Sequence, residues 1–159
     1  MLKITLITLG KLKEKYLAEA ANEYIKRLGG LCGFSLIELE PVRLPEKPSN
    51  SQITAALEVE GKKIIAKIPS GAAIIPLCIE GRQMSSEELS KTLENLTAVY
   101  GRVVFIIGSS YGLCDEVKSL GKMGISMSAM TFPHQLARVM LLEQIYRALK
   151  ISCGGTYHK

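Results

Sequence analysis

Val103-Val104-Phe105-Ile106-Ile107 runs directly into Gly108-Ser109-Ser110-Tyr111-Gly112. An apolar run without alternation is typical of a strand that is buried on both faces, and the glycines that follow end it in a loop. Two further segments come next, Ile125 to Thr131 and then Phe132 to Gln135, which opens a helix. This succession of loops indicates a ligand pocket that is built late in the chain.

The helix predicted from Pro133 to Lys150 is apolar on every side. At about 100° per residue, its apolar side chains fall in every quadrant around the helix axis. The residues concerned are Leu136, Val139, Met140, Leu141, Leu142 and Ile145. Because one protein core can cover only part of such a surface, the helix predicts a homodimer.

Strand and helix patterns alternate along the chain. The expected strands are 2–9, 34–39, 72–79, 103–107 and 125–128, and the expected helices are 16–28, about 51–67, 85–96, 115–120 and 133–150. Ser85 and Glu88 have the spacing of a capping box at the start of the third helix. The alternation predicts a single-domain α/β fold with a largely parallel sheet and helices on both faces.

The composition sets limits on the function. A chain of 159 residues with 47% hydrophobic content fits one domain. The net charge of +5 and the pI of about 9.0 favour a polyanionic partner only mildly. The four cysteines form no C-x-x-C pair, so no metal site is expected. With no signal sequence and no membrane-spanning run, we expect a cytoplasmic protein that does not associate with membranes.

In open parallel sheets, ligands bind beyond the carboxyl ends of the strands. The loops that follow the later strands are therefore the place to look for a site. The chain has neither the G-x-G-x-x-G fingerprint after its first strand nor a P-loop anywhere, which disfavours ordinary dinucleotide and nucleotide binding.

The segment Gly108 to Gly112 also matches the G-x-S-x-G pattern of a serine esterase, with Ser110 as the nucleophile. The acid would have to be Asp115 or Glu116, which is too close in sequence to reach a histidine behind Ser110. The other interpretation is a glycine loop whose backbone approaches a flat ligand closely.

Motifs over essentially the whole chain resemble those of one known family. They are 2–16, 23–28, Gly108 to Gly112, Ser126 to Thr131, Phe132 to Arg138, Glu143 to Ala148 and the closing Tyr157-His158-Lys159. In these segments the chain resembles the ribosomal large subunit methyltransferase H family of the SPOUT superfamily.

The resemblance implies a single SPOUT methyltransferase domain over 1–159, homodimeric, with a deep C-terminal trefoil knot and cofactor loops within about 72–159. It implies methylation of N3 of a pseudouridine in 23S rRNA of the ribosome, with S-adenosylmethionine as methyl donor. The implied cofactor-binding residues are Leu77, Gly108, Met127, Ser128, Ala129, Met130, Thr131 and Phe132. The family commonly has two successive glycines where this chain has Gly108-Ser109, which bears on loop geometry and cofactor affinity.

The reaction requires loss of the imide proton on N3, by a neutral histidine or with help from a cation. Motif matches give His134, Arg147, Tyr157, His158 and Lys159 as catalytic candidates, and Arg138, Arg147, His158 and Lys159 as RNA-binding candidates. Because Arg147 lies roughly opposite His134 on the helix, the resemblance implies a composite site built from two protomers.

Structural alternatives accompany these assignments. Glu143 and Arg147 are spaced for an intrahelical ion pair, His134 could cap its helix, and the tail after Gly154-Gly155 could be disordered. The sequence leaves open which residue is the general base, and whether naked rRNA, the large subunit or the whole ribosome is the substrate. A noncatalytic nucleic-acid-binding dimer is the second hypothesis.

Overall fold

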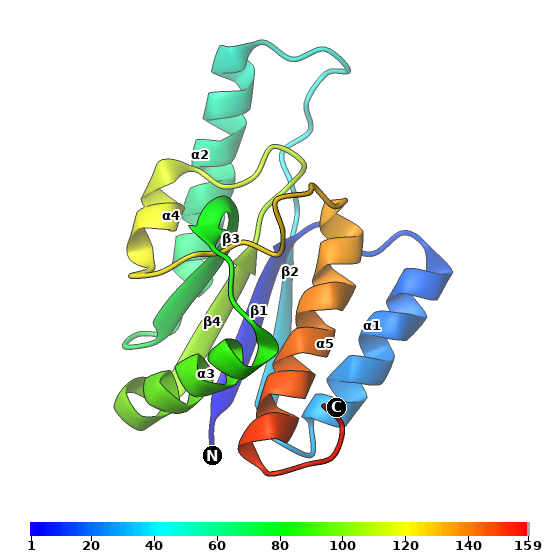
Figure 1. Ribbon diagram of the computed structural model, residues 1–159. Coiled ribbons are helices and arrows are strands. Elements are labelled where there is room, and N and C mark those ends of the chain that lie inside the picture. The colour runs from blue at the N-terminus through cyan, green and yellow to red at the C-terminus, as the bar shows by residue number, and fades with distance from the viewer. Residues whose placement is uncertain (159) are drawn as a thin grey trace.

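The computed structural model describes residues 1–158, which form a four-stranded parallel sheet with helices on both faces (Figure 1). The strands are β1 (Lys3–Leu9), β2 (Gly33–Leu39), β3 (Ala73–Arg82) and β4 (Arg102–Ile107), in the order β2-β1-β4-β3. In register, Leu6 of β1 lies opposite Leu36 of β2 and Phe105 of β4. The predicted α/β class and the parallel sheet are confirmed.

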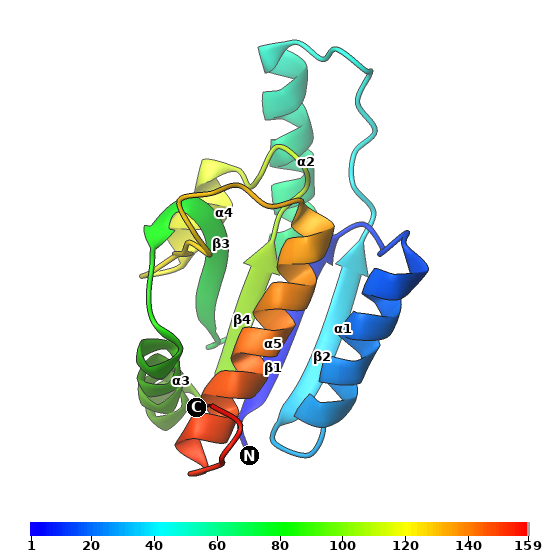
Figure 2. The ribbon, with the colours of Figure 1, turned by 45° about the vertical axis from the view of Figure 1, so that its right-hand side comes forward.

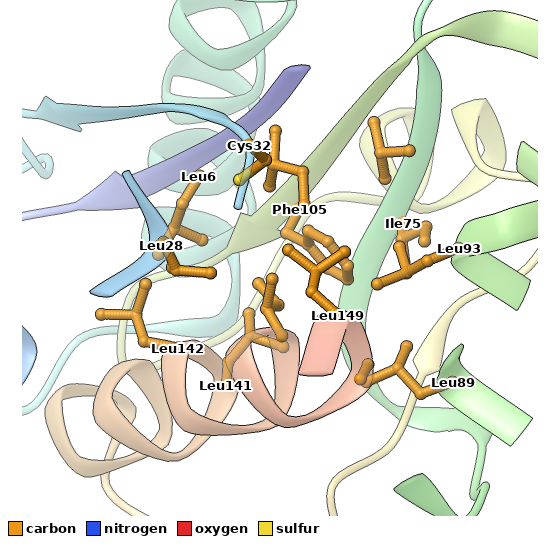
Figure 3. Close-up of a cluster of buried hydrophobic side chains, with 14 of the residues drawn as sticks. Leu6, Leu28, Cys32, Ile75, Leu89, Leu93, Phe105, Leu141, Leu142 and Leu149 are labelled. Carbon is orange, nitrogen blue, oxygen red and sulfur yellow. The ribbon is translucent and has the colours of Figure 1, made fainter. Parts of the chain in front are cut away.

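Two hydrophobic clusters, one on each face, hold the helices to the sheet. Helices α1 (Lys15–Leu28), α3 (Ser86–Tyr100) and α5 (His134–Ser152) cover the face to which Leu6 and Phe105 point (Figure 3). Helices α2 (Asn50–Lys67) and α4 (Asp115–Leu120) cover the other face, over Ile7 and Ile106. Burial on both faces explains why β4 is a continuous apolar run.

Local signals begin and end helix α3, and the first of them is the one that the sequence predicts. The Ser85–Glu88 capping box is present, since the Glu88 N–H donates to Ser85 Oγ at 3.1 Å and the Ser85 N–H to Glu88 Oε2 at 2.7 Å. Helix α3 ends at Gly101, whose φ of 66° is in the left-handed region. The first half of α2 and the segment 40–49 project beyond the carboxyl edge of the sheet (Figures 1 and 2).

The fifth strand predicted at 125–128 is not present as a strand. Only Ile125 makes bridges, one to Leu77 and one to Arg82. The Arg82 N–H donates to the Gly124 carbonyl at 2.9 Å, and the Ser126 N–H donates to the Arg82 carbonyl at 3.1 Å. β3 bends around Ile125 and contacts it from two places. The segment therefore has no straight neighbouring strand with which to form a continuous ladder of hydrogen bonds.

The end of β3 and the segment before α5 approach each other at glycines. A Cβ at Gly81 would lie 2.6 Å from the carbonyl carbon of Ile125, and a Cβ at Gly124 would lie 2.6 Å from Cys78 Sγ. A side chain at Gly81 would force the two backbones apart, and one at Gly124 would displace the Cys78 side chain. Glycine is therefore required here by the close approach of the two segments.

Helix α5 buries one stripe and leaves the rest only partly covered. The buried residues of the stripe are Ala137, Arg138, Leu141, Leu142, Ile145, Ala148 and Leu149. Leu136 on another side is 38% exposed, while Val139 and Met140 line an open cavity. One chain thus covers part of this helix, as expected, and the homodimer stays a prediction. No helix among residues 1–158 has both the length and the apolar character needed to cross a membrane.

Gly81→Ala should lower the free energy of unfolding by about 1–3 kcal/mol, the usual range for overpacking, because the added methyl meets backbone atoms that cannot rotate away. The midpoint of urea unfolding measures this change. Gly30→Ala is the matched control, since its Cβ would meet nothing closer than the Arg27 carbonyl at 3.8 Å. Equal stability of the two variants would contradict the close approach at Gly81.

Candidate functional site

A pocket lies at the carboxyl ends of β3 and β4, where three segments meet. It is lined by Leu77, Cys78 and Ile79 from β3, by Ile107, Gly108, Ser109 and Gly112 from the turn after β4, by Ser126, Met127, Ser128, Met130, Thr131 and Phe132, and by His134 and Ala137 from α5. The lining is mainly apolar, with hydroxyl groups and an imidazole among it. This composition suits a small organic ligand that carries a few polar groups.

Glycines shape the turn that forms one wall of this pocket. The Gly112 N–H donates to the Ser109 carbonyl at 2.9 Å, and Gly112 has a φ of +88°, in the left-handed region. A Cβ at Gly108 would collide with the carbonyl group of Gly112. Glycine at 108 is therefore required for the turn to close.

The structure brings the expected cofactor-binding residues together, with one exception. Leu77, Gly108, Met127, Ser128, Met130, Thr131 and Phe132 all line the pocket, whereas Ala129 does not. Ser128 fixes this loop locally, because its Oγ accepts the Met130 N–H at 3.0 Å and its carbonyl accepts the Ser126 hydroxyl at 3.1 Å.

His134 is the catalytic candidate that lies at this pocket. Burial lowers the pKa of its imidazole below the usual 6.5, and the positive charges of Arg138 and Lys13 lower it further. The ring is therefore neutral at pH 7 and can accept a proton.

Arg138 is buried against the ends of β1 and β2. Its Nη1 lies 2.7 Å from Glu38 Oε2, and its Nη2 donates to the Gly10 carbonyl at 2.8 Å. The side chain is 3% exposed. The sequence suggested Arg138 as an RNA-binding residue, but its guanidinium is not available to RNA in this position. The group instead holds the ends of β1 and β2 against α5.

A tail cluster lies at the far end of α5, near the C-terminus in Figure 1, and consists of Arg147, Tyr157 and His158 with Glu143 and Glu87. Arg147 Nη2 is 2.6 Å from Glu143 Oε1, and its guanidinium lies over the Tyr157 ring at 4.8 Å. Tyr157 donates to Glu143 at 3.2 Å, and His158 Nε2 is 2.8 Å from Glu87 Oε1. The expected Glu143–Arg147 ion pair is thus present, and Tyr157 and His158 are packed against the protein.

Burial raises the pKa of Tyr157 to about 12, so at neutral pH its hydroxyl is a hydrogen-bond donor and not a base. None of Arg147, Tyr157 and His158 lines the pocket of their own chain. A cavity of about 380 Å³ lies between the pocket and the tail cluster. Met127 lines it on the pocket side, and Glu143 lines it on the side of the tail cluster. Lys159 lies outside the described residues.

Two residues at the site were not predicted from the sequence. Lys13, exposed in the loop after β1, donates its backbone N–H to Gln135 Oε1 at 3.4 Å and so lies near His134. Glu60 of α2 is buried and accepts a hydrogen bond from Ser109 Oγ at 2.8 Å. A signal for Glu60 was present, because it lies three residues after Leu57 and four before Ile64 and so shares the side of the helix that carries these apolar residues.

Other chemistries find less support. Ser110 is exposed, and helix α4 begins only at Asp115, so the turn does not place a serine at the start of a helix as an esterase requires. Within residues 1–158, neither histidine hydrogen-bonds to Ser110. No group of three or more potential metal ligands occurs in that same part of the chain.

Comparison with known proteins gives consistent matches over the full length. Residues 2–158 match the family described as predicted SPOUT methyltransferase. The chain is 47% identical over 159 residues to ribosomal RNA large subunit methyltransferase H of Streptococcus thermophilus, with 99% of this chain and 100% of that protein covered. Proteins of the same name from Clostridium acetobutylicum and Clostridioides difficile are 47% and 46% identical over 160 residues, with the same coverage.

The imidazole of His134 should titrate below 6.5 in an NMR pH titration. Because folding lowers its pKa, the stability that it contributes is complete above 6.5 and is lost as the pH falls through the folded-state value. Lys13→Ala should raise the pKa by removing one of the charges that lower it. Lys15→Ala, whose ammonium pairs with Glu19, should leave it unchanged. A midpoint above 6.5 would disprove the neutral imidazole.

Proposed function

The chain belongs to the SPOUT methyltransferase family and to its ribosomal RNA large subunit methyltransferase H members, and on that premise we propose that it methylates N3 of a pseudouridine in 23S rRNA with S-adenosylmethionine. The observation that carries the proposal is the convergence of the β3 end, the 108–112 turn and the 126–132 segment on one pocket beside His134. The proposal includes a single SPOUT domain over 1–159, with the cofactor loops in about 72–159.

The pocket residues fit such a cofactor. Glycine at 108 lets the turn close, and Gly108, Ser109 and Gly112 then form one wall of the pocket. Leu77, Met127 and Phe132 offer apolar surface, while Ser128 and Thr131 offer hydroxyl groups. When bound, S-adenosylmethionine supplies a methyl group that is activated by a positively charged sulfur.

The work left to the protein is positioning and proton removal. N3 of the base becomes a nucleophile when its proton leaves, and the neutral His134 imidazole at the pocket is the group placed to take that proton. Held by the pocket residues, S-adenosylmethionine would supply the methyl group for the new N3–carbon bond, and its sulfur would be released as a neutral thioether. The cations of the tail cluster would stabilise the negative charge that develops on the base.

A trefoil knot belongs to this proposal. Ile125 bridges both Leu77 and Arg82, so the segment before α5 lies between two parts of the β3 end. Chain on both sides of a segment is what threading requires. Connections in most folds avoid threading, so the knot is proposed from these contacts together with membership of the family.

A homodimer with composite sites also belongs to it. Ile79 and Met130 beside the pocket are 79% and 75% exposed, and Leu136 of α5 is partly exposed. Large apolar side chains around a binding site are suited to being covered by another protein surface. Since Tyr157 and His158 lie away from their own pocket, they would serve the pocket of the other protomer.

Titration with S-adenosylmethionine should show binding. In a methylation assay that compares naked rRNA, large subunits and whole ribosomes as substrates, the protein should methylate the rRNA of at least one of them. Ser110→Ala should keep both activities, because Ser110 is exposed in the turn and has no catalytic role in this mechanism. Binding of RNA without S-adenosylmethionine would instead favour the noncatalytic nucleic-acid-binding dimer.

Mixed dimers test the composite site. One protomer lacks Tyr157-His158-Lys159. The other carries Gly108→Leu, which prevents its 108–112 turn from closing. If sites are shared between protomers, one of the two sites keeps both intact parts, and about half of the wild-type activity should remain. A site built within one subunit predicts none. Sedimentation showing a stable monomer at micromolar concentration would exclude the composite site.

A further inference from the structure

Glu60 carries a buried carboxylate that lies directly behind the 108–112 turn. The residue is 3% exposed, and both of its carboxylate oxygens accept hydrogen bonds. Oε1 accepts from Ser109 Oγ at 2.8 Å, and Oε2 accepts from the Val42 backbone N–H at 2.9 Å. One carboxylate thus joins the turn that lines the pocket to the segment that leaves β2.

Gly61 explains how Glu60 reaches this position. A Cβ at Gly61 would lie 2.5 Å from Cys114 Sγ and 3.4 Å from Val117 Cγ2, so α2 packs closely against the chain that follows the turn. Glycine is a poor helix former, and this close approach accounts for its presence in the middle of α2. The preceding residue is thereby held beside Ser109.

The charge of Glu60 is satisfied by neutral donors alone. Among the described residues, no Lys, Arg or His forms an ion pair with it, whereas Glu38, for example, pairs with Arg138. A buried carboxylate without a cation is tolerated only when it is well hydrogen-bonded. Each of the two donors is therefore needed, and the segments that supply them are held in place.

Ser109 connects this anchor to the cofactor pocket. Ser109 lines the pocket while its hydroxyl donates to Glu60 of α2. The carbonyl of Ser109 accepts the Gly112 N–H, the hydrogen bond that closes the turn. A turn with glycines at both ends has many conformations open to it. Fixing its middle before the ligand arrives reduces the entropy that binding would otherwise lose.

We propose that Glu60 is a positioning residue for the cofactor pocket, which acts through the Ser109 hydroxyl to hold the 108–112 turn in its binding conformation. This inference rests on the proposed function. It also gives the serine at 109, where the family commonly has a second glycine, a definite role. Glu60 and Ser109 act as one unit, and through Val42 the same carboxylate holds the segment after β2 beside the turn.

Three variants of the full chain test the unit: Glu60→Gln, Ser109→Ala and the double variant. The glutamine amide has one oxygen acceptor, and the Val42 N–H can only donate, so the amide oxygen stays with Val42 and the bond donated by the Ser109 hydroxyl is lost. Each single variant should raise the Kd and the KM for S-adenosylmethionine about tenfold with little change in kcat, as expected when binding alone is weakened. The double variant should be no worse than either single variant, because both remove the same bond.

Glu58→Gln is the matched control, an identical change at an exposed position on the same helix, and it should leave the KM unchanged. Unchanged KM in Glu60→Gln, or effects of the two single variants that multiply in the double variant, would overturn the inference. If Glu60→Gln fails to fold, the KM of Ser109→Ala decides. Wild-type protein that does not bind S-adenosylmethionine would overturn the proposed function and this inference with it.

Discussion

The contact between the end of β3 and the segment before α5 is the constraint on which the rest of the structure depends. Gly81 and Gly124 let two backbones approach closely, and Ile125 bonds to both parts of the bent strand. From that point the chain is directed past the end of β4, so the 126–132 segment faces the 108–112 turn. The pocket follows from this crossing, because neither segment could form it alone.

Much of the fold was predictable because it rests on local rules. The apolar run of β4, the Ser85–Glu88 capping box and the alternation of strands and helices all report on neighbouring residues, and the structure has them as expected. The strand predicted at 125–128 was wrong for a nonlocal reason. Its β-like pattern reflects burial between Leu77 and Arg82, and no sequence pattern reports that β3 bends.

The candidate site was predictable to a similar degree. Of the residues that the family resemblance gave as cofactor-binding, all line the pocket except Ala129. The resemblance did not anticipate that Arg138 would be buried against Glu38, since an arginine at a helix surface and one under a loop look alike in sequence. Glu60 was not predicted, because a glutamate within a helix is usually exposed, although its spacing puts it on the same side as Leu57 and Ile64.

The crossing at Ile125 also has a consequence for the order of assembly. Its partners, Leu77 and Arg82, lie more than forty residues earlier in the chain, and α5 comes after all of them. Contacts between distant parts of a chain form slowly, because a long loop must close before they stabilise anything. Because His134 and Ala137 of α5 line the pocket, during synthesis it can be completed only after this helix has emerged, so an incomplete chain would carry most of the sheet without a complete pocket.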